Sequence, residues 1–190
     1  IGLYPESFNA WFTWARSKSY EGDHGKAAEY YKKASEIRPQ DYQSVLMQMN
    51  CLVALGDTLN ANKQAREGLQ RAEVFLDLNP GEYRARNMGA FALHRLGRTD
   101  EAEAWMATSM QNSPRNSVLT CNAARFYALL GDIDKSLDYL SQAACTGCLN
   151  IDWLEQDEGF KAVKEDPGYS EIIKRFKRGC SCGHANPAYF

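Results

Sequence analysis

The sequence lacks several features that mark whole classes of protein. No apolar run approaches the roughly 20 residues that a membrane-spanning helix needs, and the first residues do not follow the pattern of a signal peptide. Lysine and arginine (22) do not outnumber aspartate and glutamate (24), whereas nucleic-acid-binding domains usually carry a strongly basic balance. We therefore predict no membrane span and no nucleic-acid partner, and we expect a cytoplasmic protein.

Cysteine is also sparse, because six in 190 residues are too few for a disulfide-built scaffold. Cys51 and Cys121 fall in apolar helical stretches, and we interpret them as small buried hydrophobic residues. The other four form one C-x-x-C pair and one C-x-C pair, a spacing unusual for a structural zinc site: Cys145, Cys148, Cys180 and Cys182. We predict no metal and no cofactor, and a cysteine-based metal or redox site remains an alternative.

Signs of catalysis are missing as well. His24, His94 and His184 fall in a predicted turn, a predicted helix and the tail, with no nucleophile or carboxylate arranged around them. No glycine-rich phosphate loop with a lysine follows a strand, and no segment favours a strand at all. We predict that the chain is not an enzyme and has no catalytic residues.

What the sequence does have is a long internal period. Its prolines at positions 5, 39, 80 and 114 are separated by 34, 41 and 34 residues, and its glycines at positions 22, 56, 97 and 131 by the same intervals. Two residue types that share one period indicate a repeat protein, in which each unit packs only on its neighbours. Small residues stand five positions after each glycine, at Ala27, Ala61, Ala102 and Ser136, where two helices can approach closely.

Each unit has the pattern of a helical hairpin. Apolar residues recur at spacings of three and four on both sides of the glycine, which is typical of amphipathic helices. Gly-Asp at Gly22, Gly56 and Gly131 combines a left-handed helix end with an N-cap for the next helix. We predict an all-α fold of four hairpins over residues 6–39, 41–80, 82–114 and 116–148, then capping helices over 149–179 and a flexible tail over 180–190.

The second hairpin is seven residues longer than the others, and the extra residues lie between Ala61 and Pro80. Seven residues make about two helical turns, so the insertion lengthens the second helix without changing the face that it presents. The projecting end, near Val74 and Phe75, supports an alternative function as a structural spacer or oligomerisation element that forms a homodimer.

These residues resemble the tetratricopeptide repeat family over about residues 5 to 148. In the first unit the family pattern falls on Trp11, Gly22, Ala27, Tyr31, Ala34 and Pro39, with Ala15 where a glycine is often found. The resemblance implies a right-handed superhelical solenoid with a concave groove lined by the first helix of each pair. It also implies a non-enzymatic module for protein–protein interaction.

The end of the chain resembles the tail of repeat arrays in bacterial signalling proteins, with Trp153, Asp157, Phe160 and the run Asp166–Tyr169 in the matching places. That resemblance implies a regulatory parent with a cyclase, winged-helix or kinase-type module upstream. Pro5 falls one period before Pro39, so we expect the array to begin before Ile1.

The helical phase puts a set of mostly polar residues on the groove side of the first helices. Aligned by their glycines, Arg16, Asn50, Phe91 and Arg125 are equivalent. The full candidate groove is Phe12, Arg16, Asn50, Arg84, Asn87, Phe91, His94, Asn122 and Arg125. Because arginine pairs with carboxylates and asparagine bridges backbone groups, we predict a peptide partner with acidic or carboxylate groups, or a neighbouring domain. The alternative is that these are ordinary solvated residues.

Overall fold

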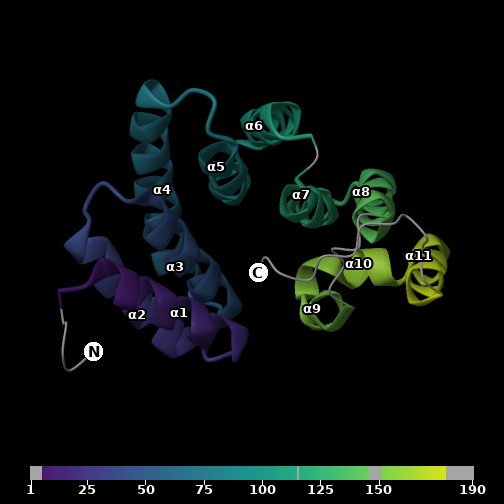
Figure 1. Cartoon of the computed structure of the whole chain (residues 1–190), viewed down its shortest axis with the longest axis horizontal. Coiled ribbons are helices and arrows are strands. Elements are labelled where there is room, and N and C mark those ends of the chain that lie inside the picture. Colours follow the sequence, from purple (N-terminus) through teal and green to yellow (C-terminus); the bar gives the residue numbers. More distant parts are fainter. Residues whose placement is uncertain (1–5, 115, 146–150, 179–190) are drawn as a thin grey trace. The chain divides into compact units, whose positions relative to one another are not determined.

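The computed structural model describes residues 6–114, 116–145 and 151–178, and every regular element in these ranges is a helix. The prediction of an all-α helix–turn–helix fold is confirmed. The chain divides into two compact units, one ending at Asn112 and one beginning at Ser113 (Figure 1). None of the described helices is both long and apolar enough to cross a membrane.

Unit 1 contains three helical hairpins in sequence. Within each hairpin the two helices pack together, and the second helices of the first two hairpins also pack on the first helix of the next one. This is the neighbour-only packing of a repeat array. The six helices are α1 (Phe8–Tyr20), α2 (His24–Ile37), α3 (Tyr42–Ala54), α4 (Thr58–Leu78), α5 (Tyr83–Arg95) and α6 (Thr99–Asn112).

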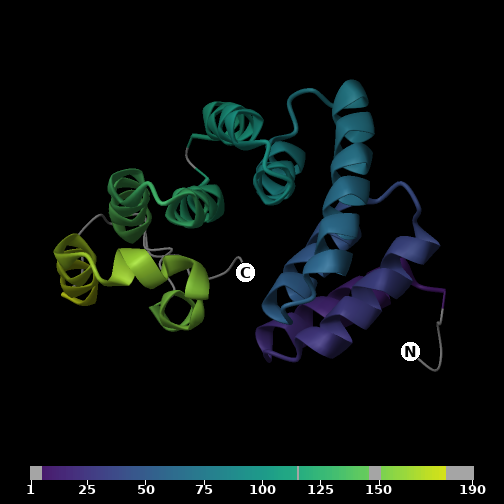
Figure 2. The same cartoon turned by 180° about the vertical axis from the view of Figure 1, so that it is seen from behind.

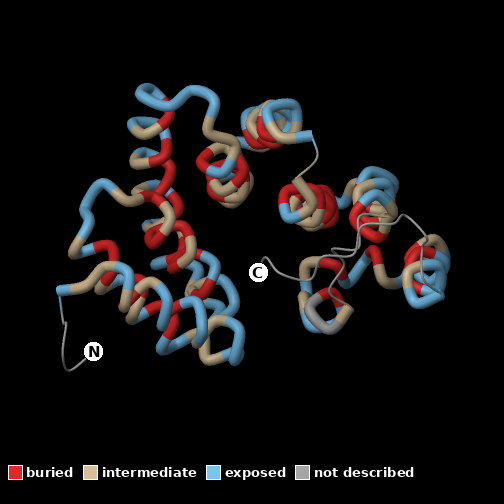
Figure 3. The backbone as a smooth tube through the Cα atoms, viewed as in Figure 1, coloured by how far each residue is buried: buried red, intermediate tan, exposed pale blue. Residues whose placement is uncertain are grey.

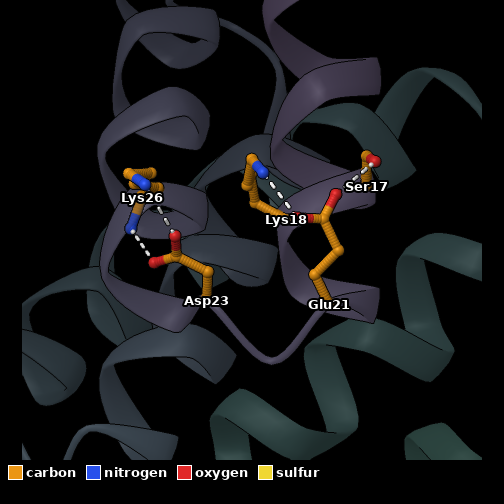
Figure 4. Close-up of polar contacts among 5 residues, drawn as sticks. All are labelled: Ser17, Lys18, Glu21, Asp23 and Lys26. Carbon is orange, nitrogen blue, oxygen red and sulfur yellow. Dashed lines mark hydrogen bonds and ion pairs between the residues drawn. The ribbon is translucent and has the colours of Figure 1, made fainter.

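The turn inside each hairpin is built as the sequence predicts. Gly22 has φ +77°, and the N–H of Asp23 donates to the carbonyl of Lys18 at 2.9 Å, which closes a Schellman motif. The Asp23 side chain then accepts from the N–H of Lys26 at 3.1 Å and begins α2 (Figure 4). Gly56, Gly97 and Gly131 repeat the left-handed geometry, with φ between +74° and +80°.

Small residues set the distance between paired helices. Ala27, Ala61, Ala102 and Ser136 are fully buried. Two helical glycines mark still closer approaches, because a Cβ on Gly68 of α4 would lie 2.4 Å from Cδ2 of Leu46, and a Cβ on Gly89 of α5 would lie 2.4 Å from Cζ3 of Trp105. The buried residues therefore follow one side of each helix, as Figure 3 shows.

Helix α4 has 21 residues, whereas α2 and α6 have 14, and it is the long rod in Figures 1 and 2. Its last turns are held by the start of α3. The Phe75 ring lies 5.1 Å from the Tyr42 ring, and Arg71 donates to the carbonyl of Asp41 at 3.0 Å. Val74 and Leu78 in the same turns are 60% and 82% exposed, so the extension also carries two exposed apolar side chains.

Unit 2 is a fourth hairpin covered by short helices. These are α7 (Ser117–Leu130) and α8 (Ile133–Cys145), then α9 (Ile151–Gln156), the 3-10 turn η1 (Glu158–Phe160), α10 (Lys161–Lys164) and α11 (Pro167–Lys177). Leu140 of α8 shares one buried cluster with Phe160, Val163 and Ile173. The C-terminal helices thus cover apolar surface that a further repeat would otherwise bury. The predicted tail at 180–190 lies outside the described residues.

Candidate functional site

Three of the candidate residues in unit 1 are exposed on three successive first helices: Arg16 on α1, Asn50 on α3 and Arg84 on α5. Within residues 6–114, 116–145 and 151–178, their side chains make no ion pair and no hydrogen bond. The helices that carry them are neighbours, because α3 packs on α5 and the Ser19 hydroxyl lies 3.4 Å from the Cys51 sulfur between α1 and α3. We call Phe12, Arg16, Asn50, Arg84, Phe91 and His94 the first-helix surface.

Half-buried rings lie among these exposed polar groups. Phe12 packs edge-on against Tyr31 with ring centroids 5.5 Å apart, and it stacks on Phe8 at 5.6 Å. Phe91 and His94 on α5 are also half-buried, and burial lowers the pKa of His94 and so favours its neutral form. The first-helix surface therefore offers two arginine cations and an amide beside aromatic carbon.

Asn87 requires a correction. Although the helical phase places it with Arg84 and Phe91, it is only 3% exposed, and its Nδ2 atom donates to the Met106 sulfur at 3.4 Å. The close approach of α5 and α6 at Gly89 draws this part of α5 into the hairpin core. Asn87 cannot contact a ligand in this conformation, and we leave it out of the first-helix surface.

The remaining two candidates belong to unit 2. Asn122 is half-buried on α7, one turn before Arg125. Nε of Arg125 donates to Oδ2 of Asp157 at 2.6 Å, and the two side chains are 27% and 11% exposed. Arg125 therefore already holds a carboxylate, which comes from the turn before η1 in its own chain.

In the sequence, Asp157 is noted only as part of the tail resemblance, which does not predict its contact with Arg125. Its other oxygen, Oδ1, accepts from the N–H of Gly159 at 2.8 Å, which fixes the orientation of the carboxylate. The chain around it is tied down further, because Lys164 donates to the carbonyl of Glu155 at 2.7 Å and to that of Asp157 at 3.2 Å. Arg125 and Asp157 are 32 positions apart, and no local sequence pattern reveals this pair.

The structure describes only one of the four cysteines of the alternative metal or redox site. Cys145 is a free, half-buried thiol, whereas Cys148, Cys180 and Cys182 lie outside the described residues. Cys51 is buried, as expected for a small hydrophobic residue, and burial raises the pKa of its thiol; Cys121 is half-buried. Over the described ranges, no group of three histidine, cysteine or acidic residues has the arrangement of a metal site.

Comparison with known proteins agrees with this architecture. Residues 8–41, which contain the first hairpin, match the family model described as tetratricopeptide repeat. Among curated proteins, none matches the chain at a significant level. Three solved structures share the fold, each with a TM-score of 0.54.

The first is a thermophilic TPR protein of Thermus thermophilus, with 18% identity over 90% of this chain and 98% of that one. The second is pilF of Pseudomonas aeruginosa, with 16% identity over 94% of this chain and 78% of that one. A putative kinesin light chain of Podosopora anserina with nearly identical TPR-like repeats has 15% identity over 92% and 95%. At these identities the likeness concerns the fold alone.

Proposed function

We propose that unit 1 binds a peptide segment of a partner, or a neighbouring domain, on its first-helix surface, because residues 8–41 match the tetratricopeptide repeat model and the fold is shared with solved repeat proteins. Proteins of this fold are in general non-enzymatic interaction modules, and their stacked hairpins present long open surfaces. We propose that this chain works in the same way, as part of a larger regulatory protein, a context that the resemblance of residues 153–169 to signalling-protein tails supports.

The observation that carries this proposal is that three successive first helices of unit 1 carry exposed arginine and asparagine side chains with no ion pair or hydrogen bond in the described residues. Other charged side chains of unit 1 pair locally, as Lys33 does with Glu29 at 2.8 Å and Lys26 with Asp23 at 3.1 Å. Arg16 and Arg84 on the first helices have no such neighbour in the described residues. Arginine is suited to a partner carboxylate because its planar fork can donate two parallel hydrogen bonds.

Asn50 lies on α3, between α1 and α5 in chain order, and can make a different kind of contact from the two arginines. Its amide can donate to a backbone carbonyl and accept from a backbone N–H of the same peptide, which holds an extended segment without regard to its sequence. Phe12 offers apolar area beside Arg16. The combination fits an extended segment with at least one carboxylate.

Peptide display against the full chain tests the proposal. We expect selected peptides to bind about tenfold more weakly to Arg16→Ala and to Arg84→Ala, because each change removes an arginine contact of the size seen at binding hot spots. Arg66→Ala is the matched control, since Arg66 is an exposed arginine on the second helix α4 and makes no ion pair in the described residues. Equal binding to all three variants would contradict the proposal.

A second function is favoured by the exposed apolar side chains near the end of α4. Val74 and Leu78 are 60% and 82% exposed on consecutive turns of its extension, as expected for an apolar seam between two copies of the chain. Sedimentation velocity should then show a dimer that Val74→Lys with Leu78→Lys converts to a monomer. Phe75 is unsuitable for this test because it packs on Tyr42, so its replacement would disturb the fold itself.

A further inference from the structure

Two of the four hairpins carry an arginine at the position six residues before the turn glycine: Arg16 and Arg125. The helix ends that follow are the same, because Gly22 and Gly131 have φ of +77° and +80°. The next N–H closes each end on the carbonyl of Lys18 at 2.9 Å or of Tyr127 at 3.0 Å. Each arginine therefore has the same position relative to the end of its own helix.

The side chain four residues after each arginine is also comparable. Leu129 follows Arg125 and Tyr20 follows Arg16, and both are exposed apolar groups, at 38% and 69%. On the second and third hairpins the same two positions hold Asn50 with Ala54 and Phe91 with Arg95. Only the first and the fourth hairpin thus combine an arginine with a large apolar neighbour one turn later.

In unit 2 the arginine and its apolar neighbour, Arg125 and Leu129, contact a turn of the same chain. Asp157 binds Arg125, and Gly159 lies against both members of the pair, since a Cβ on it would be 3.4 Å from Leu129 Cδ2 and 3.6 Å from Arg125 Nε. The same Cβ would be only 2.9 Å from Oδ1 of Asp157. The turn that aims the carboxylate therefore favours glycine two residues later.

We infer that Arg16 and Tyr20 are the open counterpart of the Arg125–Leu129 pair and bind an aspartate–X–glycine turn of a partner protein. The carboxylate would pair with the Arg16 guanidinium, and the glycine backbone would pack on the Tyr20 ring. Arg16 is exposed and makes no ion pair in the described part of the chain, so charge complementarity selects an acidic occupant. This inference rests on the proposed function and specifies the chemistry of the partner.

The Asp157–Gly159 turn of this chain provides the peptide that tests the inference. A fluorescent peptide with the sequence of residues 154–162 contains the Asp157–Gly159 turn, and its binding to the full chain is measured by anisotropy. We expect binding that weakens about tenfold when the peptide aspartate is replaced by asparagine and about tenfold in Arg16→Ala. Arg66→Ala should bind the peptide as wild type does.

Two results would overturn the inference: no binding of this peptide, or a loss that occurs in Arg125→Ala and not in Arg16→Ala. Display-selected peptides separate this failure from failure of the proposed function. If such peptides bind in a manner that depends on Arg16 or Arg84 but show no preference for aspartate–X–glycine, the first-helix surface binds peptides of another kind. If none depends on either arginine, both the inference and the proposed function fail.

Discussion

Arg125 of α7 and Asp157, the N-cap of η1, lie 32 residues apart in sequence, and their side chains form a 2.6 Å ion pair that joins the last hairpin to the helices covering it. Asp157 is 11% exposed, so the pair is largely shielded from water. Removing one partner leaves the other charge poorly solvated, which costs more than the loss of an exposed ion pair.

We therefore predict that Arg125→Ala lowers the free energy of unfolding by about 1–3 kcal/mol, the usual cost of losing a hydrogen bond to a charged group. Urea unfolding followed by circular dichroism measures it. Arg16→Ala is the control, because it removes an exposed arginine at the equivalent position and should change stability by less than about 0.5 kcal/mol. A double-mutant cycle with Asp157→Ala should show coupling, and additive effects would rule out the pair as the cause.

Turn glycines should be far less tolerant than other exposed glycines. Gly22→Ala places a Cβ in a left-handed conformation at φ +77°, which costs about 1–2 kcal/mol although no atom lies within 4 Å of that Cβ. Gly81 is equally open but has no positive φ, so Gly81→Ala should be neutral or stabilising. Thermal melts of the two variants compare them, and equal midpoints would disprove the backbone explanation.

Gly68 should be intolerant for a different reason. An added Cβ would lie 2.4 Å from Cδ2 and 2.7 Å from Cγ of Leu46, both inside the α3–α4 core, so Gly68→Ala should destabilise the protein by about 1–3 kcal/mol. Gly25 of α2 is the control, because its nearest neighbour, Asp23 Oδ1, is 3.9 Å away and helix propensity favours alanine there. Adding Leu46→Ala should make Gly68→Ala less costly than it is alone, and no such rescue would refute the steric account.

The N-cap aspartates predict an acid-sensitive fold. The backbone N–H of Lys26 lowers the pKa of Asp23, and the side chain of Asn60 lowers that of Asp57, both from an ordinary value of 3.8. Because these folded-state pKa values are depressed, the stabilisation is fully present above about pH 4 and is lost as the pH falls through them. Asparagine caps a helix without titrating, so Asp23→Asn with Asp57→Asn should flatten the fall in melting temperature below about pH 4. An unchanged pH profile would argue against this cause.

The sequence predicts those parts of the fold whose determining residues lie close together along the chain. The hairpin turns could be predicted because a glycine with positive φ and the capping aspartate after it are adjacent in sequence, as at Gly22 and Asp23. The seven extra residues before Pro80 appear in α4 for the same reason, since helical periodicity continues through them.

The candidate site could be predicted only in part, because exposure depends on contacts between elements. Arg16, Asn50 and Arg84 are exposed as their helical phase indicates. Asn87 has the same phase but is buried, because Gly89 lets α5 approach Trp105 of α6 closely. The partner of Arg125 was equally hidden, since it comes from a turn that packs on α7 only in the folded chain.

The central claim is that the first helices of unit 1 bind the partner. Chemical-shift mapping of the ¹⁵N-labelled chain with a display-selected peptide tests it most directly. We predict that the shifted amides and side chains lie in α1, α3 and α5, around Arg16, Asn50 and Arg84. Shifts confined to the second helices α2, α4 and α6, or to α11, would contradict it.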